Sequence, residues 1–137
     1  MLYPAKFDLQ EVGCYVVSFR DIPEALTQGY SIEEAQKQAL DALITAFDFY
    51  FEDNRAIPLP SESLEGEYLI ELPLSTWSKV LLLNTMLEQR VSQSELAKRL
   101  HRTRQEMQRI IDLNHSTKID TVAEALKALG KKPTLSI

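Results

Sequence analysis

The fold of the C-terminal half of the chain is decided by residues 92–111, SQSELAKRLHRTRQEMQRII. Ser92 and Thr103 each stand three residues before a Glu, which is the pattern of a capping box at the start of a helix. The pattern predicts helices at about residues 93–100 and 104–112, with only three residues between them. Such a short turn holds the second helix across the first, which is the helix-turn-helix arrangement.

Apolar positions in this stretch agree with two helices that pack against each other. Those expected between the helices are Leu96, Leu100, Met107, Ile110 and Ile111, with the small Ala97 where the helices approach. Residues 92–100 resemble the first motif helix of phage-repressor-like proteins, and the resemblance covers about residues 75–130. Such motifs usually place Gly directly after the first helix, whereas this chain has His101. Histidine adopts left-handed backbone more readily than most residues, so the turn is still expected.

The exposed side of the second helix is predicted to read DNA. Its expected base contacts are Arg104, Gln105, Gln108 and Arg109, because Arg can pair with guanine and Gln with adenine in the major groove. Lys98, Arg102 and Lys118 are placed to meet phosphates, which hold register without reading sequence. Gln93 and Thr103 complete the set of expected DNA contacts. The alternative is that these Arg and Gln side chains only solvate a helix surface.

Two further helices complete an all-α C-terminal domain over residues 74–137. Apolar residues at helical spacing predict a helix over about residues 75–89. A capping pattern at Thr117 predicts the start of the last helix, and Gly130 stands where a helix C-cap is expected. The second half is therefore predicted to be four helices joined by short turns.

The N-terminal half, residues 1–73, opens with the pattern of β-strands. Alternating apolar and polar residues predict a hairpin with strands at residues 2–9 and 14–19. A short third strand is expected at residues 25–28, where Gly29 ends it. This part of the chain therefore predicts a small sheet.

One helix and a last strand follow in the N-terminal half. A capping box at Ser31 opens a helix that is predicted to run to about Phe51. Two prolines then require a loop over residues 54–63, and alternation returns in a strand over residues 68–72. The first domain is therefore ββ(β)αβ, and the chain as a whole belongs to the α+β class.

The two halves of the chain carry opposite charge. Residues 1–74 hold four basic and fourteen acidic side chains, a net charge of −10, and residues 75–137 hold eleven and six, a net charge of +5. Opposite charges on two halves indicate two surfaces with different partners. The alternative is that charge only keeps each half soluble.

The composition argues against disulfides, metal sites and membrane spans. Cys14 is the only cysteine, which excludes an internal disulfide and fits a reducing cytoplasm. His101 and His115 lack the companions that a metal or proton-transfer site needs. The chain has no signal-peptide pattern and no run of about 18 apolar residues. We therefore expect a cytoplasmic protein with no cofactor, no metal and no membrane contact. Because each half alone is small, we also expect a homo-oligomer, either a dimer or a tetramer.

Residues 19–35 resemble the signature of the HicB antitoxin family. The run FRDIP at residues 19–23 matches a strand that ends in an aromatic residue before an Asp-x-Pro turn. The run TQG at residues 27–29 and the pair Glu-Ala at residues 34–35 match a Thr-x-Gly step and the opening of a helix. With the C-terminal motif, the resemblance spans nearly the whole chain. It is to the HicB proteins that carry a helix-turn-helix rather than a ribbon-helix-helix.

This resemblance implies both a partner and an activity. The partner is a HicA-like toxin, a small basic protein that cleaves mRNA and is bound by the N-terminal domain. The family resemblance also implies repression of its own operon through operator DNA, and a partial ribonuclease-H-like N-terminal fold. An acidic half is what a basic partner would require. Candidate toxin contacts are Asp21, Glu24, Glu52 and Asp53, each of which could equally belong to a solvated acidic face.

Two other functions are weighed against this one. A stand-alone repressor would use its N-terminal domain to sense a small ligand. A metal-dependent nuclease would need several carboxylates around divalent ions about 4 Å apart. Asp8, Asp21 and Asp48 are available, but no strand supplies the dense acidic set of such sites, and Asp21 fits better as a turn residue. We therefore predict a protein that is not an enzyme.

Overall fold

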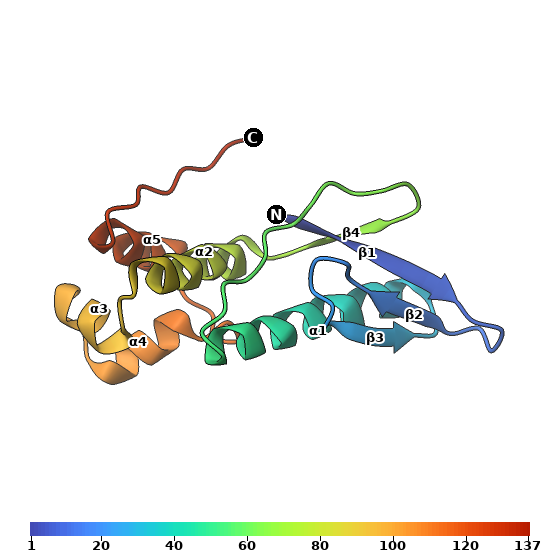
Figure 1. The fold of residues 1–137 in the computed structure, drawn as a ribbon, viewed down its shortest axis with the longest axis horizontal. Helices are drawn as coiled ribbons and strands as arrows, with labels where there is room; N and C mark the ends of the chain where they lie inside the picture. The colour runs from blue at the N-terminus through green and yellow to red at the C-terminus, as the bar shows by residue number, and fades with distance from the viewer. The chain divides into compact units, whose positions relative to one another are not determined.

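The computed structural model describes all 137 residues, and the chain divides into two compact units (Figure 1). Unit 1 comprises Met1–Asp53 and Ile57–Leu72, and unit 2 comprises Asn54–Ala56 and Pro73–Ile137. Unit 1 contains a four-stranded sheet and one helix, whereas unit 2 contains four helices. The predicted α+β class, with a sheet first and a helical region after it, is confirmed.

The sheet of unit 1 is antiparallel throughout. Its strands are β1 (Leu2–Leu9), β2 (Tyr15–Ser18), β3 (Leu26–Gly29) and β4 (Tyr68–Glu71), in the order β3-β2-β1-β4. β1 and β4 lie side by side although most of unit 1 separates them along the chain (Figure 1). The first half of β1 pairs with β4 and the second half pairs with β2, so Tyr3 lies opposite Ile70 and Phe7 opposite Val17. Alternate residues of each strand point to the same face, and Tyr3, Val17 and Ile70 are buried on it.

Helix α1 (Ile32–Glu52) packs against β2, β3 and β4. It begins where predicted, because the Ser31 Oγ accepts a hydrogen bond from the Glu34 backbone N–H at 3.1 Å. Its buried residues recur at helical spacing and are Ala35, Ala39, Leu43, Ala46, Phe47 and Tyr50. The Tyr3 and Phe47 rings have centroids 5.5 Å apart, which joins helix and sheet in one core.

The strand boundaries of unit 1 differ from the predicted ones by one residue in places. The third strand is Leu26–Gly29 rather than residues 25–28, because the Ala25 N–H donates to the Ile22 carbonyl in the preceding turn at 3.0 Å. The second strand is likewise shorter than predicted, Tyr15–Ser18. The predicted loop after α1 is present, and the Tyr3 hydroxyl donates to the Pro58 carbonyl at 2.8 Å.

Unit 2 is built from α2 (Leu74–Gln89), α3 (Gln93–Arg99), α4 (Arg104–Ile111) and α5 (Ile119–Ala128). α2 contacts α4 and α5, and α3 also contacts both of them. The core contains one or more apolar residues from each helix, among them Val80, Leu83, Leu96, Met107, Ile110, Val122 and Leu126. The helices therefore enclose a common apolar centre.

Three helices of unit 2 end in the same way, with a residue in left-handed backbone. These residues are Arg90, His101 and Gly130, at φ of 56°, 54° and 79°. After α5, the Gly130 N–H donates to the Lys127 carbonyl and the Lys131 N–H to the Leu126 carbonyl, both at 2.9 Å. This is the Schellman arrangement, which satisfies carbonyls that a helix end would otherwise leave unpaired. The helix end expected at Gly130 is confirmed.

The predicted cap at Thr117 is wrong. α5 begins at Ile119 with Lys118 as its N-cap residue, and no side chain caps it. The Thr117 Oγ1 instead donates to the Arg109 carbonyl, at 3.3 Å. The hydroxyl is used at the end of α4, because threonine bonds whichever backbone group the fold brings near.

Candidate nucleic-acid interface

α3 and α4 are joined by a turn in which His101 has φ of 54°. The His101 N–H donates to the Lys98 carbonyl at 3.2 Å, and the Arg102 N–H donates to the Ala97 carbonyl at 2.9 Å. These two bonds repeat the arrangement seen after α5. His101 thus occupies the left-handed position at which a glycine is usual, and only four residues, 100–103, separate α3 from α4.

The start of α4 is fixed by a complete capping box. The Thr103 Oγ1 accepts from the Glu106 N–H at 3.1 Å, and the Glu106 Oε2 accepts from the Thr103 N–H at 2.9 Å. α3 begins with one of these two kinds of hydrogen bond: the Ser92 Oγ accepts from the Glu95 N–H at 3.1 Å. The hydroxyl of Thr103, an expected DNA contact, is therefore used to hold the helix start.

The two faces of α4 differ sharply. Met107, Ile110 and Ile111 are buried toward the rest of unit 2. The four residues expected to read bases are all exposed: Arg104, Gln105, Gln108 and Arg109. The structure thus places these four side chains together on the solvent side of one helix, where hydrogen-bond donors and acceptors are free to meet a ligand.

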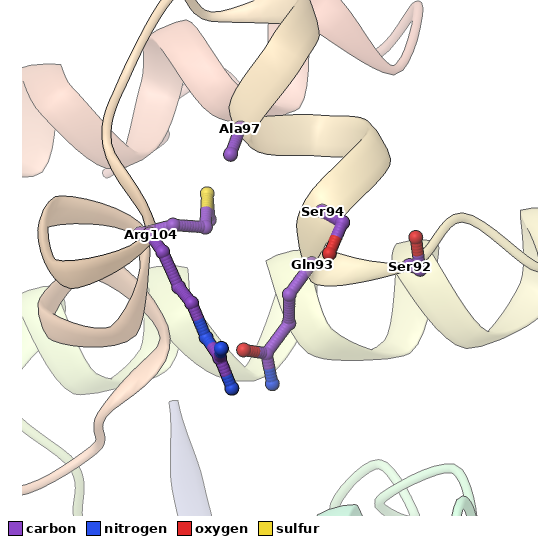
Figure 2. Close-up of a pocket in the computed structure, with 6 residues that line it drawn as sticks. Ser92, Gln93, Ser94, Ala97 and Arg104 are labelled. Carbon is purple, nitrogen blue, oxygen red and sulfur yellow. The ribbon is translucent and has the colours of Figure 1, made fainter.

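A cleft opens between the starts of α3 and α4. It is lined by Ser92, Gln93, Ser94, Ala97, Arg104 and Met107 (Figure 2). In Figure 2 the Gln93 and Arg104 side chains extend in the same direction, away from Ala97. Gln93 of α3 and Arg104 of α4, two of the expected DNA contacts, therefore line the same cleft.

The expected phosphate contacts differ in their exposure and in the side chains that they bind. Lys98 and Lys118 are exposed. Arg102 is half-buried, and its guanidinium forms an ion pair with Glu124 at 3.1 Å. An ion pair at the surface contributes little to stability. Arg102 would nevertheless have to exchange Glu124 for a phosphate if it bound DNA.

Asp21 of unit 1 holds a loop in place. Its carboxylate accepts from the Ser61 N–H at 3.0 Å and from the Ser61 hydroxyl at 2.8 Å. The neighbouring Arg20 forms a bidentate pair with Glu67, with Nε–Oε2 and Nη2–Oε1 distances of 3.0 Å. Together these bonds fasten residues 61–67 to the turn after β2, as a turn role for Asp21 would require.

Arg20 sets the electrostatics of this loop. Its hydrogen bonds, followed by one from the Leu64 backbone N–H, hold the pKa of the Glu67 carboxyl below its ordinary value. The same pair raises the pKa of the Arg20 guanidinium. The pair with Arg20 therefore favours the ionised form of Glu67.

The other candidate toxin contacts lie on the surface of unit 1. Glu24 is exposed and accepts a 2.6 Å hydrogen bond from the Tyr50 hydroxyl of α1. Glu52 is the last residue of α1, and Asp53 is its C-cap. All three are solvent-accessible, but they lie on different segments, the turn before β3 and the end of α1.

The carboxylates weighed for a nuclease are not gathered at one point. Asp8 pairs with Lys6 on β1 at 3.5 Å, Asp21 bonds Ser61, and Asp48 lies on α1. No group of three or more His, Cys, Asp or Glu side chains is arranged to hold a metal ion. None of the helices is long and apolar enough to cross a bilayer.

A family model of HicB-like antitoxins of bacterial toxin–antitoxin systems matches residues 2–81. The chain belongs to this family. The match covers all of unit 1 except Met1, and it continues into α2.

Relatives of this HicB-like chain match it almost from end to end. Antitoxin HicB of Escherichia coli is 54% identical over 135 residues, which is 98% of each chain. Antitoxin HicB 2 of Photorhabdus laumondii is 60% identical over 131 residues, 96% of this chain and 92% of the relative. Antitoxin HicB of Pseudomonas fluorescens is 40% identical over 129 residues, 93% and 88% of the two chains. The HicB resemblance seen at residues 19–35 is confirmed.

Sequence reasoning missed one residue of unit 2, Lys79. It lies on α2 and is 1% exposed, whereas a lysine is expected at the surface. A lone lysine in a helix carries no local signal of burial, because its partners come from distant segments.

Proposed function

We propose that this HicB-like protein is an antitoxin with two activities. Unit 1 binds and neutralises a HicA-like mRNA-cleaving toxin, and unit 2 binds operator DNA and represses the operon that encodes both proteins. The protein acts in the cytoplasm as a dimer or tetramer and is not an enzyme. The single observation that supports DNA binding best is the exposed row of Arg and Gln on α4, next to a capped turn.

Geometry and charge both favour DNA as the ligand of unit 2. A short turn at His101 joins α3 to α4, and such a turn is typical of proteins whose second helix enters the major groove. Arg104 and Gln108 are one helical turn apart on the exposed face, so both can reach base edges at once. The excess of basic residues in this half adds attraction to phosphates.

Toxin binding is assigned to unit 1 on family membership and charge. The family model matches this part of the chain, and unit 1 carries the acidic excess. A toxin that acts on RNA must present a basic surface, and an acidic surface steers such a partner toward it. Candidate contacts are Asp21, Glu24, Glu52 and Asp53; of these, Asp21 also accepts hydrogen bonds from Ser61 within unit 1.

The DNA activity is tested by replacing Arg104 and Gln108 together with Ala. Each lost base contact costs about 1–3 kcal/mol, so affinity for the DNA upstream of the gene should fall by roughly thirtyfold or more. The matched control changes Gln36 and Lys37, which are exposed on α1 of unit 1. Fluorescence anisotropy with labelled DNA measures both variants. Equal affinity for the two would show that α4 does not read the operator.

The antitoxin activity is tested by co-expression with the small basic protein of the adjacent gene. The pair should co-purify, and cells that express the neighbour should grow only when this chain is present. A stand-alone repressor would bind DNA but would neither co-purify with the neighbour nor rescue growth. A nuclease would cleave RNA by itself when magnesium is added.

A further inference from the structure

A charged side chain is buried in unit 2 against backbone carbonyls. The Lys79 Nζ, on α2, donates to the carbonyls of Arg109 at 3.2 Å, Asp112 at 2.7 Å and His115 at 2.5 Å. Two of these carbonyls lie in or at the end of α4 and the third lies in the loop after it. All three hydrogens of the ammonium group are thus used.

Burying the Lys79 ammonium costs free energy, which hydrogen bonds to well-placed acceptors must offset. Burial disfavours a cation and lowers the pKa of the Lys79 ammonium, while the negative charge of Asp112 acts in the opposite direction. The last carbonyls of a helix carry partial negative charge, which favours a cation there. Three carbonyls around one ammonium replace its hydration shell, so the side chain joins α2 to the end of α4.

The carbonyls held by Lys79 belong to the segment that carries expected DNA contacts. Arg109 is exposed on α4 by its side chain, while its carbonyl is bound by Lys79 and by the Thr117 hydroxyl. The loop from Asp112 to His115 then leads to Lys118, the N-cap of α5. One buried cation therefore fixes the backbone on both sides of this loop.

We propose that Lys79 is a positioning residue for operator recognition. It holds the last turn of α4 and the loop after it so that Arg109 and Lys118 face the DNA together. This role rests on the proposed DNA-binding function of unit 2. Lys79 itself is buried and touches no DNA.

The test replaces Lys79 with Met, which keeps the length of the side chain and removes its charge. Affinities for the DNA upstream of the gene and for a scrambled duplex are compared, at a temperature where circular dichroism shows a folded protein. We expect operator affinity to fall at least about tenfold, because a base contact and a phosphate contact are both weakened. Affinity for scrambled DNA should fall by a smaller factor, because only the phosphate contact of Lys118 applies there, so the ratio of the two affinities falls. The control is Lys132→Met, an exposed lysine near the C-terminus.

A lysine that only stabilised unit 2 would leave the ratio of the two affinities unchanged in the folded variant, and that result would overturn the proposal. Should Lys79→Met fail to fold, Lys79→Gln decides, since its neutral amide has only two N–H donors for the three carbonyls that Lys79 binds. The same ratio should then fall about threefold, and an unchanged ratio would overturn the proposal.

Hydrogen exchange supplies an independent readout. The His115 N–H donates to the Asp112 carbonyl at 3.1 Å, beside the ammonium. Its exchange should be about tenfold faster in Lys79→Met, while exchange in α1 is unchanged; equal protection would also overturn the proposal. Absence of operator binding by the unmodified protein would refute the DNA-binding function itself, and the positioning role would fall with it.

Discussion

At the scale of the residue, His101 adopts the left-handed backbone conformation that the turn requires, although it is not a glycine. Its φ of 54° lies in the region where a Cβ is strained. The two backbone hydrogen bonds that the turn forms at the end of α3 offset this strain. Removing the Cβ should therefore stabilise unit 2.

We expect His101→Gly to raise the free energy of unfolding of unit 2 by about 0.5–1 kcal/mol, since the relieved strain exceeds the added freedom of the unfolded chain. The midpoint of thermal unfolding should rise by roughly 3–6 °C. The control is His115→Gly, because His115 is not in left-handed backbone. That change should lower the midpoint, and an equal effect of both changes would contradict a strained turn.

Glu67 gives unit 1 a pH-dependent contribution. Its pKa is lowered in the folded state, so the stability that it contributes is fully present above the ordinary carboxyl pKa of 4.5 and is lost as the pH falls through the lower folded value. Glu67→Gln should therefore destabilise unit 1 at pH 7, and the difference from the unmodified protein should shrink at acidic pH. Urea unfolding at pH 7 and at acidic pH measures the difference in free energy of unfolding between the two proteins. Glu65→Gln, at an exposed neighbouring position, is the control.

At the scale of the element, the contact of α1 with β3 depends on the absence of a side chain. A Cβ on Gly29 would lie 2.6 Å from the Ala35 backbone nitrogen and 2.7 Å from its Cα. Both are backbone atoms of α1, so the whole helix would have to move. The Thr-x-Gly step of the sequence motif thus corresponds to a close approach of this helix to the sheet.

Gly29→Ala should cost unit 1 about 3 kcal/mol, because overpacking against backbone cannot be relieved by a rotamer change. The matched control is Gly13→Ala, where φ is 79° but nothing lies within 4 Å of the added carbon. Only the strain of about 1 kcal/mol applies there. Denaturant unfolding followed by circular dichroism compares the two. Similar losses would mean that α1 can shift at little cost.

At the scale of the whole molecule, the division into two units suggests that the two proposed activities are separable. A fragment of residues 1–73 contains all of unit 1. It should still protect cells from the toxin, although it should be less stable because a small domain buries proportionally less surface. Growth rescue and circular dichroism test this, with residues 74–137 as the fragment that should not protect. A folded fragment 1–73 that gives no protection would contradict the assignment of toxin binding to unit 1.

Several elements were predictable from the sequence because their signals are local. Capping patterns at Ser31, Ser92 and Thr103 marked helix starts, and period-two alternation marked the strands. Both patterns reflect hydrogen bonds or faces within a few residues. Strand ends were less well predicted. The turn before β3 uses the Ala25 N–H, which removes that residue from the ladder.

The sequence by itself determined the α+β class, the two short helices α3 and α4 with a brief turn between them, the opposite charges of the halves and the family. Only the tertiary structure decided how individual polar groups are used. Thr117 bonds the end of α4 instead of capping α5, Arg102 pairs with Glu124, and Lys79 binds carbonyls 30 to 36 residues away. The physical reason is the same in each case. A polar side chain bonds the nearest compatible group in space, and packing of distant segments decides which group that is.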